Sequence, residues 1–272
     1  MSASLLSCMT IRDQLLGTGF YLADASTLDR VHWAVDGRKS ILFEEPFDPT
    51  AESDLRPAVL TAILVLSDQR FFLTSDASWH GPSEITPRLY DVHASCIGVP
   101  PWVNPFHNDF SRLLVHAHAL QAKVASHEET LPVGFVRNRS LKFQHGSLLL
   151  DEWPVNNEVA TAELEKMKGS YRAIPIPAYD FQNNHIHPAS YRNELRGALV
   201  EIHFTLSHFA FKNKDTLIAD IQTLHVLHTP HTVSSIVKPR FAPSFERSSS
   251  SARSSFVQGK SDCLFNLFTN TF

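Results

Sequence analysis

The sequence predicts an α+β protein in three parts. We expect a mixed N-terminal unit over residues 1–132, an antiparallel β-barrel or sandwich over residues 133–229, and a disordered tail over residues 230–272. The β unit is predicted by the alternation of apolar and polar residues between Gly197 and Leu227, which is typical of an antiparallel hairpin. The tail is predicted by a serine-rich run at residues 248–255 that cannot bury apolar surface.

Composition and charge bound the possible classes. The chain has 272 residues, of which 43% are hydrophobic and 19% charged, so a packed core is expected and a collagen, a coiled coil or a wholly disordered chain is excluded. The net charge of -4 excludes a protein that coats nucleic acid by overall charge alone. Residues 1–132 contain 9 basic and 16 acidic residues, whereas residues 133–253 contain 14 and 11. This asymmetry indicates an acidic unit followed by a mildly basic one.

In the N-terminal unit, Thr10 is placed to cap a short helix that ends at Leu16, before Gly17. Residues 58–66 and 70–74 are rich in β-branched and aromatic side chains, so two strands are expected there. Five prolines between Gly81 and Pro105 limit any strand in that stretch to a short one.

Two further helices follow from the spacing of apolar residues. The stretch from Phe110 to Val124 has apolar side chains at helical intervals, and Asn108 or Asp109 is expected as its N-cap. A second helix is expected from Glu158 to Lys168.

The long hairpin is the strongest structural prediction. Val200, Ile202, Phe204 and Leu206 alternate with polar residues, which indicates a strand with one buried face and one solvated face. A polar turn at residues 212–214 leads into a returning strand.

The cellular compartment is predicted to be cytoplasmic or nuclear. The first residues lack the basic start and apolar stretch of a signal peptide, and the longest apolar run is far shorter than a membrane span. Three widely spaced cysteines without a CxxC pair fit a reducing environment. We therefore expect an intracellular protein that does not enter a membrane.

The common catalytic motifs are absent. The sequence contains no P-loop, no GxSxG elbow, no HExxH pair and no kinase signature. These absences disfavour common enzyme classes but leave open whether the protein is an enzyme, because catalytic triads are defined by geometry.

One metal site is an alternative. His107 and Asp109, with the distant His187, resemble the His-x-Asp…His pattern that holds Fe(II) in the 2-oxoglutarate oxygenases. Arg196 follows His187 by nine residues, where that family commonly has a cosubstrate-binding basic residue. This resemblance implies Fe(II) as a cofactor, whereas the leading hypothesis requires no cofactor.

Residues 133–228 resemble the closing strands of an OB-fold barrel. The resemblance rests on three features: the stretch leading to Gly197, the amphipathic hairpin with its basic turn, and the helix from Glu158. This helix falls where an OB-fold has a helix between its third and fourth strands. Residues 133–136 and 140–150 are the expected earlier strands. The resemblance implies a groove that pairs cationic side chains with aromatic rings, as in binding of single-stranded nucleic acid.

Two sets of residues are candidates for that interface. The first lies around the hairpin and comprises Tyr191, Arg192, Arg196, His203, Phe209, Lys212 and Lys214. The second is a basic cluster of Arg137, Arg139 and Lys142.

Three functions are therefore open. The first is a non-enzymatic binding protein whose C-terminal β unit holds single-stranded nucleic acid. The second is an Fe(II)-dependent oxygenase that uses His107, Asp109 and His187. The third is a protein–protein interaction scaffold without chemistry of its own.

Overall fold

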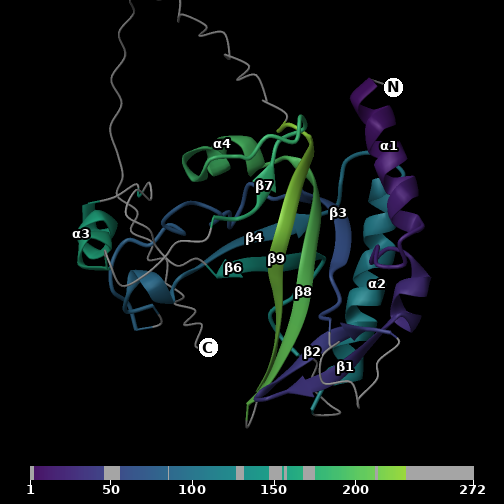
Figure 1. The fold of residues 1–272 in the computed structure, drawn as a ribbon, viewed down its shortest axis with the longest axis horizontal. Coiled ribbons are helices and arrows are strands. Elements are labelled where there is room, and N and C mark those ends of the chain that lie inside the picture. The colour runs from purple at the N-terminus through teal and green to yellow at the C-terminus, as the bar shows by residue number, and fades with distance from the viewer. Residues whose placement is uncertain are drawn as a thin grey trace, which may run out of the picture. The chain divides into compact units, whose positions relative to one another are not determined.

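The computed structural model describes residues 3–45, 56–84, 86–126, 132–146, 155, 158–167, 175–211 and 214–230. The fold is mixed α+β, with a large mixed sheet of nine strands (Figure 1). The expected disordered tail and Lys212 lie outside the described residues. Within the described residues, no helix combines the length and the apolar character that crossing a membrane requires.

The four α-helices are α1 (Ala3–Leu16), α2 (Phe106–Val124), α3 (Glu158–Met167) and α4 (Tyr191–Leu195). The nine strands are β1 (Val31–Asp36), β2 (Lys39–Glu44), β3 (Leu60–Leu66), β4 (His93–Val99), β5 (Val136–Arg137), β6 (Ser140–Gly146), β7 (Ala178–Tyr179), β8 (Leu199–Phe211) and β9 (Lys214–His228).

The predicted long hairpin is confirmed. Strands β8 and β9 pair antiparallel from Leu199 opposite His228 to Phe211 opposite Lys214. The register shifts beside His203, as at a β-bulge. The apolar side chains Val200, Ile202, Phe204 and Leu206 are buried, as the alternation predicts.

Strand pairing links the two halves of the chain. Strand β8 pairs with β3, β3 with β4, β4 with β6, and β6 with β9, which pairs again with β8. The β6–β9 pair is parallel, and the other pairs in this circuit are antiparallel. Strands β3 and β4 precede residue 132, so the division expected there falls inside one sheet and inside the compact unit 1–232.

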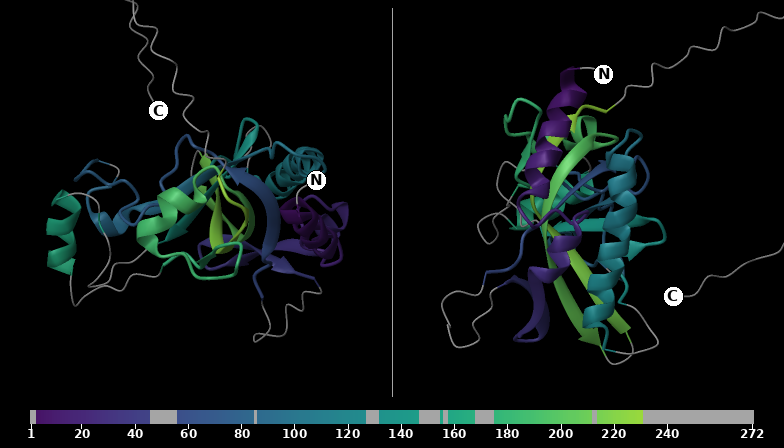
Figure 2. Two further views of the ribbon diagram at one scale, coloured as in Figure 1. Left: turned by 90° about the horizontal axis from the view of Figure 1, so that it is seen from above. Right: turned by 90° about the vertical axis from the view of Figure 1, so that its right-hand side faces the viewer.

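The main core lies between these strands and two helices. Phe143 and Phe204 meet edge to face, with ring centroids 5.0 Å apart, and Phe135 lies within 5.8 Å of both. Helices α1 and α2 lie side by side on one side of the sheet (Figures 1 and 2). The apolar stripe predicted on α2 is buried, and the Trp33 indole N–H donates to the carbonyl of Leu120, tying β1 to α2.

Several element boundaries differ from the predicted ones. Helix α1 begins at Ala3, well before Thr10. Helix α2 begins at Phe106 with Pro105 as its N-cap, so Asp109 lies in the first turn. Residues 70–74 form no strand, although Phe72 exchanges backbone hydrogen bonds with Ser95 of β4. Helix α3 is confirmed.

Candidate functional site

The residues predicted around the hairpin do not form one surface. Tyr191 was expected as an exposed ring, but it is 1% exposed, and its hydroxyl donates to the carbonyl of Ile176 at 3.0 Å. Burial is also the main cause that raises the pKa of Tyr191. The ring packs in the core beneath α4, so a base cannot stack on it.

His203 belongs to a side-chain network. Its Nε2 lies 2.7 Å from Oε1 of Glu201, and its Nδ1 lies 3.1 Å from Oγ1 of Thr61. Both ring nitrogens therefore have partners within the protein. This arrangement fixes the imidazole on the sheet and leaves little hydrogen-bonding capacity for a ligand.

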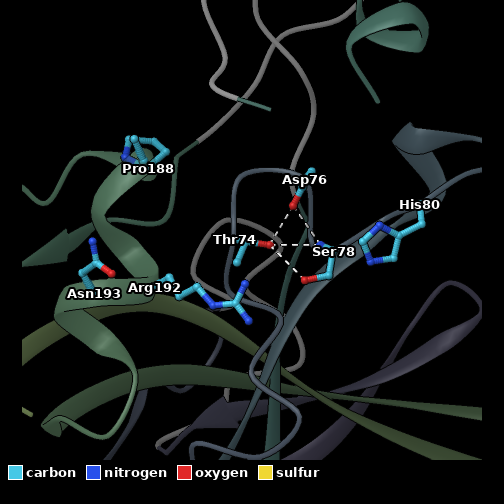
Figure 3. A pocket seen from close by; sticks show the side chains of 8 residues that line it. Thr74, Asp76, Ser78, His80, Pro188, Arg192 and Asn193 are labelled. Atoms are coloured by element: carbon cyan, nitrogen blue, oxygen red, sulfur yellow. Dashed lines mark hydrogen bonds between the residues drawn. The ribbon is translucent and has the colours of Figure 1, made fainter. Parts of the chain in front are cut away.

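The two arginines near α4 lie in different surroundings. Arg196 forms an ion pair with Asp68, Nε to Oδ1 3.4 Å, at a solvent-exposed position. Arg192 lines a pocket of about 330 Å³ together with Thr74, Ser78 and His80. Figure 3 shows its guanidinium directed from α4 toward the two hydroxyl side chains.

The carboxylate of Asp76 offsets the positive charge of Arg192 in that pocket. Oδ1 of Asp76 accepts hydrogen bonds from the Thr74 hydroxyl at 2.9 Å and from the backbone N–H of Ser78 at 3.0 Å (Figure 3). Ala77 and Ser78 both have positive φ, and these bonds hold the left-handed turn. The Arg192 pocket thus combines one cation with one buried acid, which makes it a weak site for a polyanion.

The proposed iron ligands do not come together. Among the described residues, no group of three or more His, Cys, Asp and Glu side chains is placed to hold a metal ion. Asp109 is 2% exposed and receives hydrogen bonds from Arg12 and from the Tyr21 hydroxyl. His107 contacts the carbonyl of Pro101 through Nδ1, and His187 accepts from the N–H of Ala189. The His-x-Asp pattern is therefore a helix start bound to α1, which corrects the metal-site interpretation.

Two residues of the second predicted cluster, Arg137 and Arg139, line a groove, here called the arginine groove. It has a volume of about 390 Å³. Its lining residues are Ser67, Gln69, Arg70, Ile97, Val99, Arg137, Asn138, Arg139 and Ser140. All three arginines are exposed, and no acidic residue is among those that line it. Asn138 has φ 54° at the turn between β5 and β6, so a tight hairpin presents its two flanking arginines together.

Lys142 extends this positive surface along β6. It lies opposite Ile97 of the arginine groove in the β4–β6 ladder. Burial, and then the neighbouring charge of Arg137, lowers the pKa of Lys142. No acidic side chain forms an ion pair with Lys142 or the three groove arginines within the described part of the chain. An anionic ligand would relieve the repulsion between these cations.

Phe209 lines a larger groove, here called the aspartate groove. This groove has a volume of about 720 Å³. Its lining residues include Lys39, His93, Gln144, Thr205, Phe209 and Asp220. Gln144 and Asp220 are paired residues of the parallel β6–β9 ladder. Phe209 is half-buried, so part of its ring faces the groove.

The two grooves lie along one face of the β4–β6 ladder. Side chains two residues apart point to the same face of a strand, and Ser140, Lys142 and Gln144 follow one another in this way on β6. The alternate residues Leu141 and Phe143 are buried. The six residue steps from Ser140 to Gly146 correspond to about 20 Å.

Two predicted residues remain untested. Lys212 lies outside the described residues, and only the backbone of Lys214 is described, at the start of β9. The prediction that the hairpin turn contributes cations therefore stays a prediction.

Comparison with known proteins does not establish a family for this chain. No family model and no curated protein matches the chain. Among solved structures, the chain is similar to gp2.5, a single-stranded DNA binding protein encoded by bacteriophage T7. The TM-score is 0.38 and the identity 11%, over 66% of this chain and 97% of that chain. At this TM-score no shared fold is established, so a function must be supported by the residues of this chain alone.

Proposed function

We propose that the protein binds single-stranded nucleic acid through an OB-like barrel, with phosphates held in the arginine groove and at Lys142. The circuit of strand pairs supports the barrel, because it leads from β3 through β4, β6, β9 and β8 back to β3. Helix α3 lies in sequence between the third and fourth strands of this circuit, as in an OB-fold. The strands also curve around a common centre in the left view of Figure 2.

The observation that carries the proposal is the arginine groove itself. Arg137, Arg139 and Lys142 lie on or beside the β4–β6 face, which a barrel of this kind uses for binding, and Arg70 reaches the same groove from the loop after β3. The groove offers no carboxylate that would repel phosphate. Arginine is suited to this role because its planar guanidinium donates two parallel hydrogen bonds to phosphate oxygens.

Two further residues belong to the proposal. Phe209 supplies an aromatic surface in the neighbouring groove, where a base can stack. Arg192 lies in its own pocket beside α4, and we assign it a peripheral role because Asp76 offsets its charge. The binding is non-enzymatic in this proposal and requires no cofactor.

Salt-dependent binding tests the proposal. Fluorescence anisotropy with a labelled 15-nucleotide oligothymidylate should show log K falling linearly with log salt, by about 0.7 per phosphate neutralised. Four cations predict a slope between roughly -2 and -3. Replacing both turn arginines, Arg137→Ala with Arg139→Ala, should weaken binding and reduce the slope magnitude by about 1.4.

The matched control removes two charges from another surface. Arg112 and Lys123 are exposed on α2, so Arg112→Ala with Lys123→Ala should leave the salt slope unchanged. An equal loss in both double variants would show that net charge, and not the groove, determines binding. The absence of any binding at low salt would refute the proposed function.

A further inference from the structure

Asp220 is the one acidic side chain that lines the aspartate groove. Its carboxylate accepts one hydrogen bond from a side chain of the described residues, from Nε2 of Gln144 to Oδ1 at 3.4 Å. Burial raises the pKa of Asp220, while Gln144 and the charges of His93, His145 and Lys39 act in the opposite direction. The half-buried carboxylate therefore has unused acceptor capacity directed at an open groove.

The position of Asp220 suggests a ligand. It lies opposite Gln144 on β6 and opposite Thr205 on β8. Gln144 is two residues from Lys142, so a chain whose phosphates lie in the arginine groove passes this groove next. A nucleobase of that chain is the group that would enter it.

The polar groups here select among the bases. A carboxylate offers two acceptors side by side, and the Gln144 amide beside it offers donors. The Watson–Crick edge of guanine presents N1–H, the N2 amino group and the O6 acceptor, so it matches two acceptors followed by a donor. Thymine has a single N–H between two carbonyls, and adenine has one amino group next to an acceptor nitrogen. This edge is free in a single strand and occupied in a duplex.

We propose that the aspartate groove is a guanine-selective subsite, in which the Asp220 carboxylate accepts from N1–H and N2–H and the Gln144 amide donates to O6. This inference rests on the proposed function, since the strand is delivered by the arginine groove. Phe209 lines the same groove four residues along β8 from Thr205, the residue opposite Asp220, and provides apolar surface for the adjoining base. Lys39 and His93 also line the groove and favour the phosphates on either side.

A base-substitution series tests the subsite. The probes are labelled 15-nucleotide strands of thymine whose three central bases are guanine, hypoxanthine, adenine or thymine. The wild-type protein should bind the guanine strand about tenfold or more tighter than the thymine strand, as one good bidentate pair provides. Hypoxanthine lacks the N2 amino group and should fall between them, and adenine should resemble thymine.

Two variants assign the preference to Asp220. Asp220→Asn keeps the shape of the side chain and should reduce the guanine-to-thymine affinity ratio to near one, without changing the salt slope. Asp36→Asn removes the same charge from an exposed position on β1 and should preserve the ratio.

The outcomes separate the two proposals. Equal affinity of the wild-type protein for all four strands overturns the guanine subsite and leaves the proposed function intact. A guanine preference that persists in Asp220→Asn also overturns it. Failure to bind any strand at low salt overturns the proposed function and the subsite with it.

Discussion

The ion pair between Arg12 of α1 and Asp109 of α2 should be a main interaction that holds the two helices together. The guanidinium donates from Nε to Oδ2 and from Nη2 to Oδ1, the latter at 3.0 Å, and the Tyr21 hydroxyl donates to Oδ2 at 3.1 Å. Asp109 is 2% exposed and Tyr21 0%. Burial, and then the charge of Asp109, raises the pKa of Tyr21, so the hydroxyl stays protonated and continues to donate.

The size of the effect follows from burial. Removing one partner of a buried ion pair costs about 3–5 kcal/mol because the other charge is left uncompensated. The Arg12 side chain is 15% exposed, so water can reach part of it, and we expect the lower end, about 3 kcal/mol, for Asp109→Asn. In a folded unit of this size that corresponds to a fall in Tm of about 6–12 °C. Tyr21→Phe removes one hydrogen bond to this carboxylate and should cost about 1.5–3 kcal/mol.

Urea unfolding followed by circular dichroism measures these values, and a double-mutant cycle tests their origin. Arg12→Met and Asp109→Leu should each destabilise strongly, whereas the combined variant should lose less than the sum, because no buried charge remains. Additive losses, or a loss below about 1 kcal/mol for Asp109→Asn, would refute the account. The same variants also separate this role from the metal-ligand hypothesis, which predicts a change in Fe(II) binding and no coupling to Arg12.

Two further predictions concern the hairpin and its surroundings. Gly134→Ala should destabilise the fold by at least about 2 kcal/mol, because φ is +116° and a Cβ would lie 2.5 Å from the carbonyl oxygen of Leu217. Thermal unfolding should show a much smaller loss of stability for the control Gly37→Ala, where φ is also positive but nothing lies within 4 Å. Burial tends to raise the pKa of Asp215, but the Ser126 N–H and His208 hold it below its ordinary value. This carboxylate therefore stabilises the fold above its unfolded pKa, and the contribution should disappear as the pH falls through the folded pKa. Urea unfolding between pH 5 and pH 2 should show this loss of stability. The Asp215→Asn variant should show a smaller dependence of stability on pH in this range.

The sequence predicts the helices and strands whose formation depends on residues close together in the chain. The stripe on α2 and the alternation on β8 depend on residues close in sequence, so their periodicity is visible in the chain. The circuit of strands was not predictable in this way, because β3 pairs with β8 across more than a hundred residues. The division expected at residue 132 came from charge, which describes surfaces and carries no information on strand pairing.

The residues of the candidate site show the same difference between local and distant sequence signals. Arg137 and Arg139 are visible as a cluster because they lie two residues apart in the sequence, and the structure places them at one tight turn. Arg70 was missed because it reaches the same groove from a distant loop. The sequence predicts Tyr191 at the surface beside Arg192, whereas the structure places it on the buried side of the short helix α4. Asp220 has no such signal in the sequence, because a lone acidic residue is not typical of a nucleic-acid interface.

Charge in this protein is organised by surface and not by segment. Arg70 comes from the acidic half and meets Arg137 and Arg139 from the basic half, while Asp220 of the basic half lines the adjoining groove. A bound strand would therefore contact the cations of the arginine groove first. Within about 20 Å along β6 it would reach the Asp220 carboxylate, which can accept further hydrogen bonds. Because phosphate contacts contribute affinity and base contacts contribute selectivity, the two proposals together assign these properties to separate grooves. Substitution of one groove should then change one property and leave the other in place.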